Sequence, residues 1–293
     1  MSRCGNRDGE VPRRAMLAPM RPPILRLAVP VLLGGCGAVP SASELAMPGD
    51  ATPGFDGSRV LTATEVEFPL QSPGKFPRAV RGADGRTYVS WLSELEGRRV
   101  SLRFVEWFEG SFSAARTIAE GDDWFVNWAD FPSVAAAADG TLAAHWLQQN
   151  GGGRYAYGVR VASSTDGGVS WGEPFWLHED QSAAEHGFAT LVPGDDGGFT
   201  GVWLDGRDVR ETGSMTLRSR TFDASGPNAD EVLIDPKVCD CCPTDAVFSD
   251  GDLVAVYRDR TDAEIRDISR LRRTDGVWGE ADACNNDLWF TPG

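Results

Sequence analysis

The sequence predicts an all-β protein made of repeated small sheets, and two observations support this. A segment that recurs four times along the 293 residues reads each time as a strand, a turn containing Asp-Gly or Asp-Asp-Gly, and a second strand. The aromatic residues that close these segments, Trp91, Trp146, Trp203 and Tyr257, lie 55, 57 and 54 residues apart. A period of this length built from short strands is typical of one four-stranded blade of a β-propeller.

Each repeat contains enough further sequence for two more strands. The four copies of the first hairpin are FPRAVRGADGRTYVSW (76–91), FPSVAAAADGTLAAHW (131–146), GFATLVPGDDGGFTGVW (187–203) and CPTDAVFSDGDLVAVY (242–257). Third strands are expected at 100–107, 156–163, 215–222 and 267–272, and outer strands near 114–118, 174–177 and 231–234. Apolar and polar side chains alternate along these segments, as they do in half-buried sheets.

The N-terminal segment predicts export. Residues 21–36, RPPILRLAVPVLLGGC, combine arginines, an apolar run too short to span a bilayer, and small residues before Cys36. Residues 33–36 resemble the lipobox of bacterial lipoproteins, in which the cysteine is lipidated; an ordinary signal peptide is the alternative. We therefore expect a signal peptide over 1–36 and a periplasmic or cell-surface lipoprotein that meets the membrane only through its lipid anchor.

The rest of the chain is expected to form one folded domain behind a tether. Residues 37–60 are rich in Gly, Pro, Ala and Ser and predict a flexible linker. Residues 61–293 are then expected to hold the sheets. Translation can begin at Met1, Met16 or Met20. The formal net charge of −15 argues against nucleic acid as a partner.

A second type of motif lies inside the second repeat. Residues 164–171 read S-T-D-G-G-V-S-W and match the pattern S-x-D-x-G-x-[ST]-W at Ser164, Asp166, Gly168 and Trp171. The pattern describes a hairpin turn in which the carboxylate accepts backbone N–H bonds and the glycines supply positive φ, so its role is structural. Weaker echoes occur at 109–112 and 274–278.

This motif, the Asp-box, inside a repeat of blade length resembles the sialidase superfamily over roughly residues 60–293. The resemblance implies a ring that usually has six blades, whereas about four fit this chain. We therefore expect a propeller truncated at its C-terminus, because residues 286–293 resemble the segment 123–128 that precedes the second blade. A genuine four-bladed ring is the alternative.

The repeat also predicts where a ligand would bind. In a propeller, the loop entering the innermost strand and the loop leaving the second strand lie on one face, around the central channel. The repeat places polar residues at both positions: Arg78, Asp130, Glu185, His186, Cys241, Cys242 and Asp245 at inner-strand entrances, and Asp205, Arg207 and Arg258 after second strands. Solvated loops with local salt bridges are the structural alternative.

The resemblance assigns roles to some of these residues. Known sialidases bind the substrate carboxylate with three arginines and use an aspartic acid as acid/base, with a tyrosine nucleophile assisted by a glutamate. Arg78, Arg207 and Arg258 match the arginine set best, with Asp130 or Asp205 as the acid. Glu185, His186 and Asp245 are further expected ligand-binding residues.

This sequence also departs from the family. It lacks the Arg-Ile-Pro motif around the first arginine and the late blades that supply the tyrosine. We therefore expect a surface module that binds a glycan or another ligand at the channel face, without a cofactor; an exo-sialidase or related glycoside hydrolase is the alternative.

The cysteines are the last unusual feature. Cys239, Cys241, Cys242 and Cys284 follow the lipid site, and export makes disulfide bonds among them the expected state. A thiolate metal site completed by His186 or Asp245 and a set of free thiols are the alternatives. Because the spacing matches no standard zinc pattern, no metal is predicted.

Overall fold

The computed structural model describes residues 64–70, 73–194 and 197–285. The chain divides into two units, Met1–Phe68 and Pro69–Gly293. Residues 64–68, the described part of the first unit, hold no helix or strand. The expected signal peptide, Cys36, the tether over 37–60 and the segment 286–293 lie outside the described residues.

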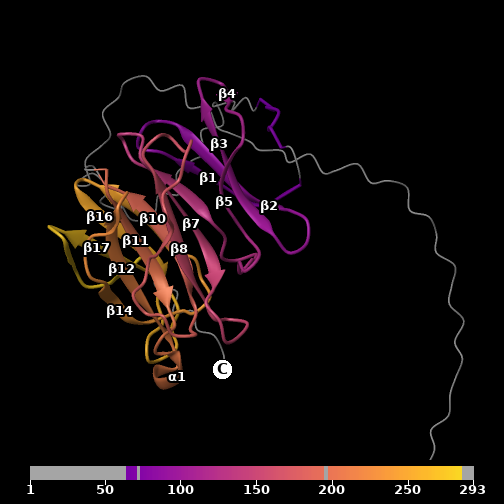
Figure 1. Ribbon diagram of the computed structural model, residues 1–293. Helices are drawn as coiled ribbons and strands as arrows, with labels where there is room; N and C mark the ends of the chain where they lie inside the picture. The colour runs from indigo at the N-terminus through magenta and orange to yellow at the C-terminus, as the bar shows by residue number, and fades with distance from the viewer. Residues whose placement is uncertain (1–63, 71–72, 195–196, 286–293) are drawn as a thin grey trace, which may run out of the picture. The chain divides into compact units, whose positions relative to one another are not determined.

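The first half of the second unit holds two antiparallel sheets, coloured indigo to magenta in Figure 1. Sheet 1 contains β1 (Gly74–Arg81), β2 (Thr87–Glu94), β3 (Val100–Phe108), β4 (Ser111–Phe112) and β5 (Arg116–Gly121). Sheet 2 contains β6 (Ser133–Ala136), β7 (Leu142–Gln149), β8 (Tyr157–Ser164) and β9 (Phe175–Trp176). Strands pair in chain order from β1 to β4 and from β6 to β9, and β5 also pairs with β3, so β1 and β6 each lie on one side of their sheet.

The second half repeats this layout in the orange to yellow sheets of Figure 1. Sheet 3 contains β10 (His186–Pro193), β11 (Phe199–Asp205), β12 (Met215–Asp223), β13 (Gly226–Pro227) and β14 (Val232–Val238). Sheet 4 contains β15 (Asp245–Ser249), β16 (Asp252–Arg258), β17 (Ile268–Thr274), β18 (Val277–Trp278) and β19 (Asp282–Ala283). The helix α1 (Val209–Thr212) follows β11; within the described residues, no helix is long and apolar enough to cross a membrane.

The expected all-β, propeller-type fold is confirmed. All four sheets begin with the hairpin that the repeat predicts, and third and outer strands follow within a few residues of their expected positions. The closing aromatics Trp91, Trp146, Trp203 and Tyr257 are each 3% exposed or less. All but Trp91 belong to apolar cores between sheets. Among the described residues, no hydrogen-bonded pairing joins β1 to β15, so the sheets form no closed hydrogen-bonded ring.

Three separate apolar cores lie between successive sheets. Phe104 and Trp146 belong to the core between sheets 1 and 2, Trp203 and Leu177 to the core between sheets 2 and 3, and Tyr257 to the core between sheets 3 and 4. Each sheet is therefore held to its neighbour by burial of the side chains that alternate along its strands.

Polar contacts near the innermost strands reinforce these cores. Ala83 donates its backbone N–H to Ala136 O at 3.0 Å between sheets 1 and 2. Thr190 of β10 donates its hydroxyl to the backbone oxygen of Thr244 at 2.8 Å, and Thr244 directly precedes β15. These contacts fix the innermost strands of neighbouring sheets relative to one another.

The turn at residues 164–171 has the hydrogen bonds that its sequence predicts. Asp166 Oδ1 accepts the backbone N–H groups of Val169 at 3.0 Å and Ser170 at 2.9 Å, and Ser164 Oγ accepts that of Gly168 at 2.8 Å. Hydrogen bonds from Ser170 and Ser164 lower the pKa of Asp166. Trp171 packs edge-on against Phe104 of sheet 1, so the turn helps to join two sheets.

Candidate functional site

Residues from the starts of three innermost strands converge. Arg78 lies in β1, Asp130 precedes β6 by three residues, and Glu185 directly precedes β10. The charges of Arg78 and Glu185 both act on the Asp130 carboxyl, although the three residues belong to or lead into different sheets. With Tyr157 of β8, described below, these residues form what we call the mouth cluster.

The fourth sheet reaches the same region. Arg78 lines a pocket of about 270 Å³ together with Asp245, which opens β15, and with Thr244 and Tyr257. The first and the last innermost strand therefore face one pocket. The repeat predicted this convergence of matching positions.

Asp130 is the most perturbed carboxyl of the cluster. Its side chain accepts the backbone N–H of Phe188 at 2.7 Å, and the residue is only 4% exposed. Burial raises the pKa of Asp130 to about 7, and the negative charge of Glu185 adds to this, while the hydrogen bond from Phe188 and the charge of Arg78 oppose it. Asp130 is therefore poised between its acid and its carboxylate form near neutral pH.

Tyr157 and Glu185 form a close pair beside it. The Tyr157 hydroxyl donates to Glu185 Oε1 at 2.5 Å, and its ring stacks on Phe125 with centroids 4.0 Å apart. Burial raises the pKa of Glu185, although the hydrogen bond from Tyr157 opposes the shift. Burial and neighbouring carboxylates also raise the pKa of Tyr157, so the phenol stays protonated. The sequence does not single out Tyr157, whose only signal is that it opens the third strand of its repeat.

An exposed tryptophan stands next to the cluster in the chain. Trp128 precedes Asp130 by two residues and is 81% exposed, whereas the tryptophans that close the repeats are buried. A large aromatic side chain left in solvent is the informative exception to apolar burial. Trp128 lies in the aromatic-rich segment 123–128, which the sequence analysis interpreted only as the segment that precedes a repeat.

Two innermost strands carry the same backbone irregularity near the cluster. The register of β10 shifts between Gly187 and Thr190, where Phe188 has φ of 51°, and that of β1 shifts between Lys75 and Arg78, where Phe76 has φ of 54°. Such bulges re-aim side chains, and positive φ is unfavourable for a bulky residue. The Asp130 carboxyl holds the Phe188 N–H in this conformation.

Gly187 is required by the close approach of the cluster. An added Cβ would overlap Asp130 Oδ2 and come within 2.9 Å of Tyr157 Cε2. Gly187→Ala is therefore expected to lower the free energy of unfolding by about 2 kcal/mol, as overpacking does. Urea denaturation measures this. The matched control, Gly153→Ala, places its Cβ in open space and should change stability by less than about 0.5 kcal/mol; equal effects of both changes would contradict this packing argument.

His145 is a buried neutral group within electrostatic reach of the mouth. It is 1% exposed, and neither ring nitrogen has a hydrogen-bond partner among the described residues. Burial lowers its pKa to about 3, and the positive charge of Arg78 adds to the shift. Buried polar atoms usually find partners, so this ring marks a place where polar groups can be accepted.

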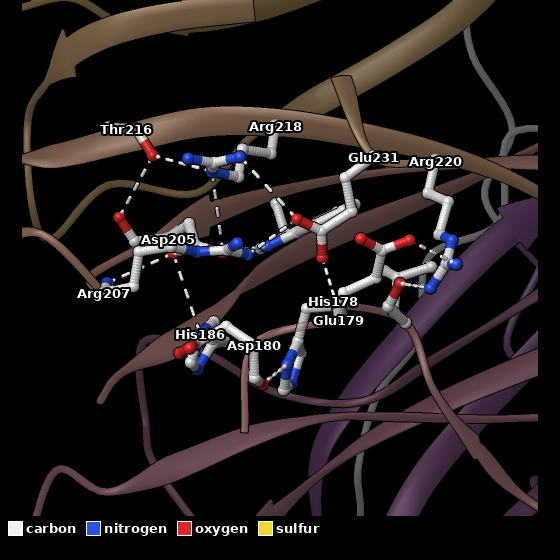
Figure 2. A network of polar contacts seen from close by, with 12 residues as sticks. His178, Glu179, Asp180, His186, Asp205, Arg207, Thr216, Arg218, Arg220 and Glu231 are labelled. Carbon is white, nitrogen blue, oxygen red and sulfur yellow. Dashed lines mark hydrogen bonds and ion pairs between the residues drawn. The ribbon is translucent and has the colours of Figure 1, made fainter. Parts of the chain in front are cut away.

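Three residues expected at the ligand site instead form a network between strands (Figure 2). Arg207 donates to both carboxylate oxygens of Asp205, at 2.8 and 2.7 Å, and to Glu231 at 2.8 Å. His186 Nε2 lies 3.1 Å from Asp180 and 3.6 Å from Asp205. The predicted ligand-binding role of Arg207 is therefore corrected, because its guanidinium already pairs with two carboxylates of the chain.

Asp205 is likewise corrected as a general acid. Burial alone would raise its pKa, but hydrogen bonds from Arg207 and Trp203 and the nearby His186 lower it to about 2. A carboxylate that stays ionised at neutral pH cannot donate a proton. His186 stacks on His178 at 3.9 Å between centroids and is fully buried, so it belongs to this network as well.

Arg258 points toward the cysteines. Its Nε donates to Arg266 O at 2.9 Å, and its Nη1 lies 3.4 Å from Cys242 Sγ. The expected set of Arg78, Arg207 and Arg258 is therefore not assembled: one lies at the mouth cluster, one in the polar network and one beside the thiols. Equivalent places in the repeat fix the face of a residue but not the direction of a long side chain.

The cysteines differ from expectation. Cys239, Cys241, Cys242 and Cys284 are all free thiols in the structure, so no predicted disulfide is formed among the described residues. The Cys242 thiol, the backbone N–H of Cys241 and Arg266 hydrogen-bond to Cys239, and these bonds lower its pKa to about 5 although burial opposes the shift.

Several solved structures are similar to this chain at low sequence identity. No family model and no curated protein matches the chain. Among solved structures, a protein of unknown function from Dyadobacter fermentans has 16% identity over 72% of this chain and 68% of its own, with a TM-score of 0.49. The GH93 alpha-L-arabinofuranosidase of Fusarium graminearum has 10% identity, 76% and 70% coverage, and a TM-score of 0.49. A NanB sialidase mutant from Streptococcus pneumoniae has 10% identity, 74% and 53% coverage, and a TM-score of 0.49.

Proposed function

We propose that the second unit binds a glycan at the mouth cluster. The observation that carries this proposal is the convergence of Arg78, Asp130 and Glu185 from three sheets on one region. The exposed Trp128 lies two residues before Asp130 in the chain. Ligand sites commonly combine aromatic surface with a few convergent polar groups whose pKa values are perturbed.

Each group has a part in sugar recognition. The carboxyls of Asp130 and Glu185 accept hydrogen bonds from sugar hydroxyls. Arg78 pairs with an acidic group on the sugar, for which a guanidinium is well shaped. Trp128 presents an apolar ring to the C–H face of a pyranose or furanose.

A glycan array followed by titration calorimetry tests this proposal. We expect the protein to retain a subset of glycans, and Arg78→Ala and Trp128→Ala each to weaken binding at least tenfold, which is about 1.4 kcal/mol. Arg81→Ala is the matched control, because it removes an exposed arginine three residues further along the same strand. Failure to bind any glycan, or equal losses for Arg78→Ala and Arg81→Ala, would overturn the proposal.

Glycoside hydrolysis is the second candidate, favoured by one specific observation. Asp130 has a pKa raised to about 7 and lies beside a second carboxyl, Glu185, and glycosidases use one protonated and one ionised carboxyl flanking the scissile bond. A panel of nitrophenyl glycosides, including sialosides and arabinofuranosides, tests it. Turnover that declines above pH 7 and is lost in Asp130→Asn is the expected result. Glycan binding without turnover would support the binding role and contradict hydrolysis.

A further inference from the structure

A tight turn after β14 gathers three thiols. Cys239 directly follows the strand, residues 240 and 241 form the turn, and Cys242 leads toward β15. The Sγ atoms of Cys239 and Cys242 lie 3.6 Å apart, those of Cys239 and Cys241 3.9 Å, and those of Cys241 and Cys242 4.0 Å. The three sulfurs therefore form a nearly equilateral triangle.

The size of this triangle fits a shared metal ion better than a covalent bond. A disulfide requires sulfurs about 2.05 Å apart, far closer than any of the three pairs. Three thiolates bound to one cation at about 2.3 Å lie about 3.8 Å apart in tetrahedral geometry and about 4.0 Å apart in trigonal geometry. The observed separations bracket these values, so a cation can enter with little movement of the sulfurs.

The turn is held in place by contacts that do not involve the sulfur atoms. Asp240 accepts the backbone N–H of Met215 at 2.9 Å through Oδ1 and pairs with Arg260 at 3.1 Å through Oδ2. Cys239 donates its backbone N–H to Arg258 O at 3.0 Å. Such outer contacts orient the ligands of metal sites before the ion binds.

Charge and access both suit a cation. Arg258 Nη1 lies 3.4 Å from Cys242 Sγ and Arg266 Nη1 3.7 Å from Cys239 Sγ, and both guanidinium groups favour the thiolate form. Three thiolates beside two guanidinium groups leave one negative charge for a cation to neutralise. Cys239 is buried, whereas Cys241 is exposed, so one side of the triangle opens to solvent.

We propose that Cys239, Cys241 and Cys242 bind one thiophilic d10 cation, Zn²⁺ or Cu⁺, as a three-thiolate site on the turn between β14 and β15. Soft thiolate ligands select these ions over hard cations such as Mg²⁺ or Ca²⁺. Thiols that are still protonated release their protons to solvent as the ion binds. A fourth position on the exposed side is available to water. This site is independent of glycan binding at the mouth cluster.

The test uses the full chain, reduced and desalted without oxygen. Zn²⁺ is titrated in competition with a chromophoric chelator, and Cu⁺ in competition with bicinchoninate. We expect one ion per chain with at least one of the two metals, and Co²⁺ substitution to give thiolate-to-metal charge-transfer absorption. Cys239→Ser, Cys241→Ser and Cys242→Ser should each weaken binding at least tenfold. Cys284→Ser is the matched control, because it removes an exposed thiol outside the triangle and should bind as the parent does.

Circular dichroism of each variant separates loss of the site from loss of the fold. Cys241→Ser is decisive here, because Cys241 is exposed and its replacement leaves the buried Cys239 in place. The proposal is overturned if the reduced protein binds neither ion, or if Cys241→Ser and Cys242→Ser both bind as tightly as Cys284→Ser. Mass spectrometry that finds a disulfide within the triangle, together with no metal uptake after reduction, would instead establish the turn as a disulfide site.

Discussion

Asp205→Ala is expected to lower the free energy of unfolding by about 3 to 5 kcal/mol, the usual effect of removing one partner of a buried ion pair. Asp205 is 1% exposed and accepts hydrogen bonds from Arg207 and from Trp203 Nε1, the latter at 2.9 Å. Without this carboxylate, the indole N–H has no acceptor there and the guanidinium keeps only Glu231 at hydrogen-bond distance. Denaturation in urea at pH 7 measures the loss.

A neighbouring aspartate provides the control. Asp208 lies three residues further along, with its side chain 43% exposed and 3.8 Å from Arg218, so Asp208→Ala should change stability by less than about 0.5 kcal/mol. The pKa of Asp205 is lowered to about 2, so its stabilisation is present above pH 4 and is lost as the pH falls toward 2. The difference between parent and Asp205→Ala should shrink over that range. Equal effects of the two alanine changes would show that the network is not structural.

Asp130→Asn is expected to stabilise the protein at pH 8, by on the order of 2 kcal/mol, and to change little at pH 4. The pKa of Asp130 is raised to about 7 in the folded protein, above its ordinary value of 3.8. The folded state then holds a proton that the unfolded state has released, so stability falls as the pH rises from 4 to 7. An asparagine stays neutral and still accepts the Phe188 N–H, so this pH dependence should disappear.

Denaturation at both pH values measures the effect. Asp122→Asn removes an exposed carboxylate and should change stability by less than about 0.5 kcal/mol at either pH. A loss of stability in Asp130→Asn at pH 8 would mean that the carboxylate is stabilised rather than strained where it lies. The same substitution also tests hydrolysis. If Asp130→Asn is more stable than the parent but inactive, the stability that the protein loses by burying this carboxyl serves its activity.

The fold was accessible from the sequence because strand patterns, turn residues and the period all indicated the same element. The turns at 109–110 and 275–276 have Glu109 and Asp275 at φ of 49°, each followed by a glycine at φ of 82°, as the weak motif echoes suggested. The short strands β4, β13 and β18 were not anticipated, because two-residue strands have no periodicity to detect.

The candidate site was only partly accessible. The repeat predicted that Arg78, Asp130 and Glu185 share one face, and in the structure the charges of Arg78 and Glu185 act on the Asp130 carboxyl. It misassigned Arg207, whose direction depends on a carboxylate, Glu231, that precedes a different strand. Side chains that reach across several turns depend on tertiary partners that no local pattern encodes.

The three separate cores have a mechanical consequence. Each sheet packs against its neighbours through an apolar core, so the arrangement of the sheets depends on three separate interfaces. A ligand bound by Arg78, Asp130 and Glu185 would bridge two of these interfaces between sheets at once. Ligand binding would then add a direct connection between three of the four sheets.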